Sequence, residues 1–199
     1  MTSPYEKKDK SKWEQITKKL VDKHPLKDQL VDLVFKSWKS IFNSSFDGFQ
    51  IGKDFFPEPQ IMGFFLHDLI ALHLHNANAD YELGSAGNEK DIECRNNSKF
   101  SIEIKTSSHK NQIFANRSYA QPNNSSKKKT KDGYFLAVNF ERFPKNKAIQ
   151  PNITLIRFGY LEHTDWIAQK AATGQQARLS TETYGKKFIT LYNSKTSAK

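Results

Sequence analysis

The clearest indication of the fold of this chain is the stretch Phe100-Ser-Ile-Glu-Ile-Lys-Thr106. Apolar and polar residues alternate along it, which predicts a β-strand that packs one face on a core. That apolar face holds Phe100, Ile102 and Ile104. On the opposite face the carboxylate of Glu103 and the ammonium group of Lys105 would lie side by side, about 6–7 Å apart along the strand. The alternative is an exposed strand with an ordinary Glu–Lys pair.

Two shorter strands precede this one and complete a predicted β-meander. They are expected at Tyr81–Ser85 and Glu89–Cys94, and the central strand at Lys99–Thr106. Turn residues at 87–88 and 96–97 separate the three strands. A tight connection before the central strand would bring Asp91 beside Glu103.

Helical spacing dominates the chain before residue 76. Helices are expected over Ser11–His24, over Leu26–Phe42 and from Pro59 through Leu72 and beyond. The third of these is apolar almost all round, which predicts that it is buried.

After the meander the pattern is mixed. Strands are expected at Tyr134–Arg142, Ile153–Tyr160 and Lys187–Tyr192, a helix at Leu161–Ala172, and a polar stretch at His109–Lys131. This order predicts an α/β or α+β fold with a mixed central sheet flanked by helices. The expected domain spans residues 11–193, mainly helical over 11–76, with the sheet and its loops over 77–193. Residues 1–10 and 194–199 are expected to be flexible.

The charge of the chain is unevenly distributed. Residues 1–99 hold 14 Lys and Arg against 15 Asp and Glu, whereas residues 100–199 hold 17 against 6. The whole excess behind the net charge of +10 therefore lies in the second half. This asymmetry favours a polyanionic partner such as nucleic acid, and a solvated basic surface is the alternative.

Several classes of protein are disfavoured by composition. Cys94 is the single cysteine, so an intrachain disulfide and a cysteine-based zinc site are excluded. No apolar run reaches membrane-spanning length, and the polar N-terminus does not resemble a secretory signal. We therefore expect a cytoplasmic protein without a membrane partner.

Asp91 and Glu103 suggest a metal site. Two neighbouring carboxylates repel each other and attract a hard dication. Mg²⁺ prefers oxygen ligands, which Asp91, Glu103, the carbonyl oxygen of Ile104 and a DNA phosphate would supply. Such an ion polarises the phosphate, while Lys105 would stabilise or orient the attacking hydroxide. The pattern predicts Mg²⁺-dependent phosphodiester hydrolysis with Asp91, Glu103 and Lys105 as catalytic residues.

At these residues the sequence resembles the PD-(D/E)XK nuclease superfamily. Asp91 matches the first acid of its motif and Glu103-Ile104-Lys105 the second element, although Lys90 stands where the motif has proline. Segments 102–108, 116–121 and 173–179 look like the ScaI-type branch of type II restriction endonucleases. This resemblance implies a divalent metal, palindromic double-stranded DNA, a homodimer and a cognate DNA methyltransferase.

A few other acidic residues and three histidines could in principle bind a metal. Superfamily members often supply one more acid from an upstream helix, and Glu58 is the candidate; the alternative is a carboxylate that stabilises a helix N-terminus. Glu82 and Glu89 are expected at the surface. The triplet Glu6-Lys7-Lys8 lacks a strand and a partner acid. A zinc site at His67, His73 and His75 is not favoured, because His73 and His75 are two positions apart and would point to different sides of a helix, and well-placed cysteines and carboxylates are lacking.

Residues that suit DNA contacts follow the central strand directly. Arginine and amide side chains grip phosphates and read base edges, and a loop leaving this strand must lie near the cleaved phosphate. The candidates in the loop are Lys110, Asn111, Asn116, Arg117, Ser118, Tyr119 and Gln121. A weaker second group is Gln175, Gln176 and Arg178. The run Lys127–Lys131 is expected to attract phosphate without reading bases.

The sequence thus predicts a type II restriction endonuclease that cleaves a short, palindromic site in double-stranded DNA. A structure-selective nuclease, such as a junction resolvase or repair nuclease, would use the same chemistry. A non-catalytic nucleic-acid-binding protein is the third alternative, but it has no need of two neighbouring carboxylates. A homodimer would cut both strands of a palindrome most simply, and the helices over 11–42 are candidates for its interface.

Overall fold

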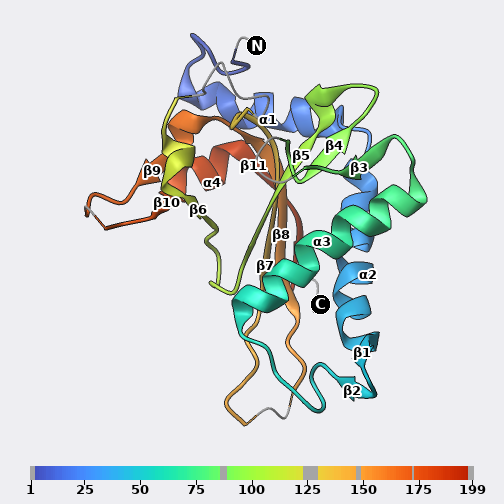
Figure 1. Ribbon diagram of the computed structural model, residues 1–199. Helices are drawn as coiled ribbons and strands as arrows, with labels where there is room; N and C mark the ends of the chain where they lie inside the picture. Colours follow the sequence, from blue (N-terminus) through green and yellow to red (C-terminus); the bar gives the residue numbers. More distant parts are fainter. Residues whose placement is uncertain (1–2, 86–88, 123–129, 147–148, 172, 197–199) are drawn as a thin grey trace.

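A six-stranded mixed sheet forms the centre of the molecule in the computed structural model, which describes residues 3–85, 89–122, 130–146, 149–171 and 173–196 (Figure 1). Its strand order is β11-β8-β7-β5-β4-β3, and only β5 and β7 run parallel. The strands are β3 (Tyr81–Leu83), β4 (Ile92–Cys94), β5 (Ile102–Ser107), β7 (Gly133–Phe140), β8 (Ile153–Leu161) and β11 (Phe188–Asn193). The predicted mixed central sheet and its antiparallel meander are confirmed.

Three helices pack with the sheet into the main hydrophobic core. They are α1 (Trp13–Asp22), α2 (Leu30–Asn43) and α3 (Pro59–Ala77), close to the expected ranges. Two 3-10 turns, η1 (Lys10–Lys12) and η2 (Lys27–Gln29), precede α1 and α2, and a small hairpin of β1 (Ser45–Phe46) and β2 (Phe49–Gln50) precedes α3. The face of β5 that carries Ile102 and Ile104 is buried in this core, as the alternation predicted.

Helix α3 lies against β5 but is not buried all round. A Cβ atom at Gly63 would lie 2.7 Å from the hydroxyl oxygen of Thr106, so the glycine allows the close approach of α3 to β5. One face of α3 enters the core, whereas Ile61, Phe64 and Leu72 are exposed. The expectation of a fully buried helix is therefore wrong for this chain on its own.

A second, smaller sheet covers the opposite face of the central sheet. It contains β6 (Phe114–Asn116), β10 (Gln176–Leu179) and β9 (Trp166–Ala168), and it is accompanied by the 3-10 turn η4 (Arg117–Ala120) and by α4 (Thr181–Lys187). Its buried side chains pack with Phe135 and Ala137 of β7 in a second core. Because Glu103 and Lys105 are the neighbours of Phe135 and Ala137 in the sheet, they project into the space between the two sheets.

The helix expected at Leu161–Ala172 is wrong. Leu161 ends β8, the 3-10 turn η5 (His163–Asp165) follows, and Trp166 begins β9. The turn is fixed by Glu162 and Asp165, which cap each other's backbone and both accept hydrogen bonds from buried Lys187. These long-range contacts outweigh the local helical spacing. The polar stretch His109–Lys131 also contains regular structure, namely β6 and η4.

The N-terminal segment is more ordered than its sequence suggests. Tyr5 is buried, and its hydroxyl group lies 2.8 Å from the hydroxyl oxygen of Thr17 on α1. The central strand also begins later than expected, because Ser98–Phe100 forms the 3-10 turn η3 before β5. Among the described residues, no helix has the length and apolar character needed to cross a membrane.

Candidate active site

Asp91 is held against the central strand by a backbone hydrogen bond. β4 pairs with β5 at Ile92 and Ile102 only, so the amide of Ile104 lies beyond the ladder. Oδ2 of Asp91 accepts a hydrogen bond from that amide at 2.6 Å. A buried backbone amide needs an acceptor, and the carboxylate supplies it. The hairpin thus places Asp91 next to the residue that separates Glu103 from Lys105.

Glu103 and Lys105 form a close pair on the face of β5 that points toward the smaller sheet. The side chain of Glu103 is 2% exposed and that of Lys105 is 16% exposed. Nζ of Lys105 donates to Oε1 of Glu103 at 2.6 Å and to the carbonyl oxygen of Ile104 at 3.2 Å. These two oxygens therefore converge on one cationic group. The predicted alternation of β5 is confirmed, and the pair lies in a sheltered site and not on an exposed strand.

Tyr119 completes this arrangement from η4. Its hydroxyl group donates a hydrogen bond to Oε1 of Glu103, and Nζ of Lys105 lies 4.8 Å from the centre of its ring. The ring also packs edge-on against Trp166 of β9. The sequence placed Tyr119 among the DNA contacts, but the structure places it against the two side chains of β5.

His67 approaches the same site from α3. Its Nε2 atom lies 3.2 Å from Oδ1 of Asp91, and its Nδ1 atom lies 2.8 Å from Oδ1 of Asp68. Burial disfavours the charged imidazole, but the hydrogen bonds and charges of Asp91 and Asp68 outweigh burial and raise the pKa of His67. Sequence reasoning missed this contact, because α3 is apolar on several faces and gave no sign of which one meets the hairpin.

The other histidines of α3 turn to separate partners. Nε2 of His73 lies 2.9 Å from the hydroxyl oxygen of Ser40, and Nδ1 of His75 lies 2.7 Å from the carbonyl oxygen of Tyr81. In the described part of the chain, no three His, Cys, Asp or Glu side chains cluster as a metal site.

The remaining acidic candidates lie at the start of α3 and on the β3–β4 hairpin. Glu58 is the exposed N-cap of α3, and nine residues of helix place it about 13 Å along the axis from His67. The structure does not bring it to the site. Glu82 forms an ion pair with Arg95, and Glu89 accepts hydrogen bonds from Ser85. Both engage local partners on the β3–β4 hairpin.

The structure brings the two groups of DNA-binding candidates together. β6 and β10 are antiparallel neighbours, and Asn116 lies opposite Gln176 although 60 positions separate them in the chain. Along β10 exposed and buried residues alternate, so Gln176 and Arg178 project from one face while Ala177 and Leu179 enter the second core. The candidates with exposed side chains are Lys110, Asn111, Asn116, Ser118, Gln121, Gln175, Gln176 and Arg178.

Two basic candidates are engaged within the protein. The guanidinium group of Arg117 donates to the carbonyl oxygens of Ala171 and Gly174, both at 3.3 Å, and so supports the turn before β10. Lys131 donates to the carbonyl oxygen of Gln121 at 2.9 Å. The rest of the basic run, Lys127 to Lys129, lies outside the described residues.

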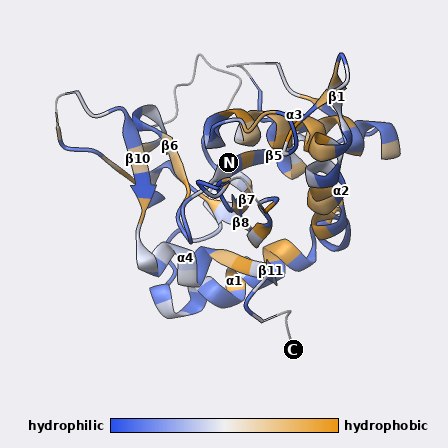
Figure 2. Ribbon diagram, turned by 90° about the horizontal axis from the view of Figure 1, so that it is seen from below, coloured by the Kyte–Doolittle hydropathy of each residue, from blue (hydrophilic) through white to orange (hydrophobic). Residues whose placement is uncertain are grey.

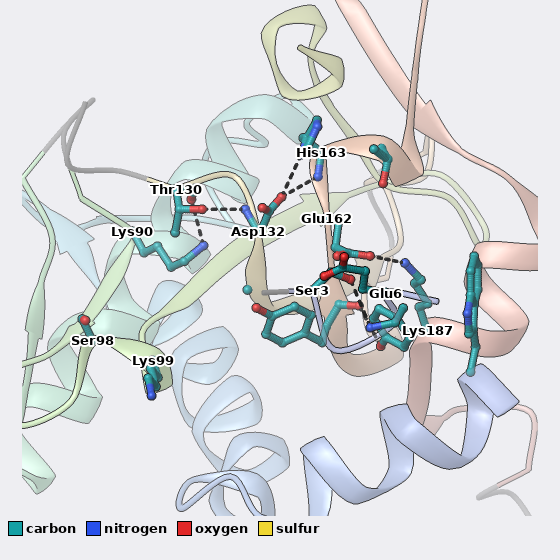
Figure 3. Close-up of a pocket in the computed structure, with 15 residues that line it drawn as sticks. Ser3, Glu6, Lys90, Ser98, Lys99, Thr130, Asp132, Glu162, His163 and Lys187 are labelled. Carbon is teal, nitrogen blue, oxygen red and sulfur yellow. Dashed lines mark hydrogen bonds and ion pairs between the residues drawn. The ribbon is translucent and has the colours of Figure 1, made fainter. Parts of the chain in front are cut away.

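A cavity of about 600 Å³ lies between the N-terminal segment, Lys90 and the loop before β7 (Figure 3). Lys90 enters it and donates to the carbonyl oxygen of Thr130, while Lys187 binds Glu162 and His163 lies beside Asp132. The side chains of Asp91, Glu103 and Lys105, all within the described residues, do not line this cavity. These internal contacts tie Lys90 and the turn η5 to the loop before β7.

Known proteins match this chain over most of its length. The family model described as ScaI restriction endonuclease matches residues 3–192. The type II restriction enzyme ScaI of Streptomyces caespitosus is 48% identical over 179 residues, which cover 89% of this chain and 79% of that enzyme. No solved structure matches significantly.

The matched region contains Asp91, the strand of Glu103 and Lys105, and the β6–β10 pair. It also covers the segments on which the sequence resemblance rested. The chain belongs to the ScaI restriction endonuclease family, as the sequence predicted, and is a type II restriction endonuclease.

Proposed function

We propose that Asp91, Glu103 and Lys105 form the active site at which this endonuclease hydrolyses phosphodiester bonds of double-stranded DNA. The observation that carries this proposal is the 2.6 Å hydrogen bond from the amide of Ile104 to Asp91. It holds the first acid beside the strand that carries the second acid and the lysine.

Type II restriction endonucleases generally use a divalent metal, and we propose Mg²⁺ for this chain. Asp91, Glu103 and the carbonyl oxygen of Ile104 would hold it, and these are the hard oxygen ligands that Mg²⁺ prefers. The fit is supported by the convergence of two of these oxygens on the ammonium group of Lys105. When bound, the ion supplies charge stabilisation at the phosphate and activation of water.

The chain's own side chains have distinct tasks. The ammonium group of Lys105 donates to Oε1 of Glu103, to the carbonyl oxygen of Ile104 and, at 3.3 Å, to the hydroxyl oxygen of Tyr119. By exchanging one of these hydrogen bonds it can donate to the attacking water or to a phosphate oxygen. Tyr119 orients Glu103 through its hydroxyl group. His67 orients Asp91 from the other side. Such partners of ligating groups fix the geometry of a metal site.

The β6–β10 pair is the proposed reading surface. In the major groove of DNA, arginine and amide side chains distinguish base pairs. Asn116, Gln176 and Arg178 meet these requirements on adjacent strands. We further propose a short palindromic site, a homodimer whose two active sites cut the two strands, and a cognate methyltransferase that protects the site.

Digestion of a phage DNA of known sequence tests the proposed function. With Mg²⁺ the protein should give discrete, reproducible bands whose sizes fit cleavage at one short sequence. With a chelator in place of Mg²⁺ the DNA should remain intact. A smear, or intact DNA with every divalent metal tried, would contradict the proposal.

A further inference from the structure

An exposed apolar surface lies over α3 and the β1–β2 hairpin. Five of the eight large apolar side chains that are exposed in the described part of the chain belong to it. They are Phe46 (52% exposed), Phe49 (61%), Ile61 (48%), Phe64 (59%) and Leu72 (46%). We call these five side chains the α3 surface. Figure 2 shows the apolar colouring of α3 near β1.

The α3 surface is continuous. Ile61, Phe64 and Leu72 recur at helical spacing and fall on one side of α3. The ring of Phe65 bridges the helix and the hairpin, with its centre 6.0 Å from that of Phe64 and 6.5 Å from that of Phe46. Helix and hairpin therefore present one connected patch.

The composition of α3 does not suit contact with DNA. Its 19 residues include one aspartate and three histidines but no Lys, Arg or Glu. Phosphate binding depends on lysine and arginine, which this helix lacks. Depletion of charge and enrichment in phenylalanine are instead characteristic of the core of a protein–protein interface.

The extent of the patch fits a dimer contact. A large aromatic side chain presents roughly 200 Å² when fully exposed, so the five half-exposed side chains present on the order of 500 Å². This approaches the largest patch on a typical monomer, and a standard interface buries about 800 Å² on each partner. A helix that is apolar all round is ordinarily buried, and a partner helix would bury its remaining face.

We propose that the α3 surface is the contact with a second copy of this chain, with α3 and the hairpin packed on the same elements of the partner about a two-fold axis. This inference rests on the proposed homodimeric function and names the surface that forms it. It also links dimer and active site, because His67 lies one turn from Phe64 on α3 and contacts Asp91. Pairing two α3 helices fixes the two active sites relative to each other.

Sedimentation velocity of the full chain without DNA tests this proposal. The wild-type protein should sediment as a species of twice the 22.9 kDa chain mass. The double variant Phe49→Glu/Phe64→Glu should sediment as a single chain, and Phe49→Ser/Phe64→Ser should shift the equilibrium in the same direction without adding charge. Circular dichroism and the melting temperature report whether each variant is folded. If the glutamate variant does not fold, the oligomeric state of the serine variant decides the test.

Ile167→Glu is the matched control, because Ile167 is 42% exposed but lies on β9 in the smaller sheet. It should remain dimeric. A folded double variant that stays dimeric, or loss of the dimer in the control alone, would overturn the assignment of the surface. A wild-type monomer at all concentrations would overturn both the surface and the homodimer. The measurement uses neither DNA nor metal, so a failure to cleave DNA would leave it unaffected.

Discussion

Nε2 of His67 lies 3.2 Å from Oδ1 of Asp91, while Oδ2 of the same carboxylate accepts a hydrogen bond from the backbone amide of Ile104. The carboxylate is thus fixed from both sides, by a helix and by a strand. Two constraints on one side chain restrict its rotation, which is the arrangement expected of a ligand that must be ready before the metal and DNA arrive.

Replacement of His67 by alanine should weaken metal binding and cleavage without unfolding the protein. Removal of such a supporting partner typically costs about 10–100-fold in metal affinity or activity. Calorimetric titration with Mn²⁺ and the rate of DNA cleavage measure the two effects. His73→Ala is the control, because His73 contacts Ser40 on α2 and not Asp91. Equal losses in the two variants would argue against a specific role for His67.

Tyr119→Phe should slow cleavage while leaving the fold intact. The variant loses the hydroxyl group that donates to Glu103 but keeps the ring that packs against Trp166. A hydrogen bond to a charged group contributes about 1.5–3 kcal/mol, so we expect a loss of roughly 10-fold or more in single-turnover rate. Tyr192→Phe on β11 should cleave at the wild-type rate. An unchanged rate for Tyr119→Phe would show that its hydroxyl group does not position Glu103.

Lys187→Met should destabilise the protein strongly. Lys187 is 1% exposed, binds Glu162 and Asp165 at 2.9 Å, and lies 4.0 Å from the centre of the Tyr5 ring. Removal of one partner leaves two buried carboxylates uncompensated, which typically costs about 3–5 kcal/mol in the free energy of unfolding. Urea denaturation measures this. The neighbouring Lys186→Met, which removes exposed ion pairing with Glu182, should leave the urea midpoint nearly unchanged.

Stability should fall as the pH is lowered through the range in which His24 titrates. His24 is buried, and burial lowers its pKa from 6.5 to about 4. Between these values the unfolded chain binds a proton that the folded protein excludes, so the free energy of unfolding decreases toward acid. The loss from this group is on the order of 3 kcal/mol at the lower limit. Thermal melts from pH 7 to pH 4 check the slope, which His24→Gln should reduce.

Local patterns in the sequence predicted the part of the site built from neighbouring strands. The alternation around Glu103 and the short turn after Cys94 are local features, and the hairpin follows from them. The contacts of Tyr119 and His67 depend instead on how η4 and α3 pack on the sheet, which no local pattern records. The pairing of Asn116 with Gln176 is likewise a long-range contact.

The error at Leu161–Ala172 has the same origin. Its spacing is compatible with a helix, but Lys187 draws Glu162 and Asp165 into a turn, and Trp166 pairs with Leu179 of β10. Tertiary contacts thereby override local preference. The β1–β2 hairpin and α4 were not predicted either, because elements of two to seven residues contain too few positions to establish a hydrophobic period.

The central claim is that Asp91 and Lys105 act in cleavage and not in DNA binding. Asp91→Asn and Lys105→Ala should abolish Mg²⁺-dependent cleavage of a DNA that the wild-type enzyme cuts, while both variants still bind that DNA in a filter-binding assay. Glu82→Gln is the control, because Glu82 lies on β3 and forms an ion pair with Arg95; this variant should cleave at the wild-type rate. Cleavage at the wild-type rate by either active-site variant would contradict the account.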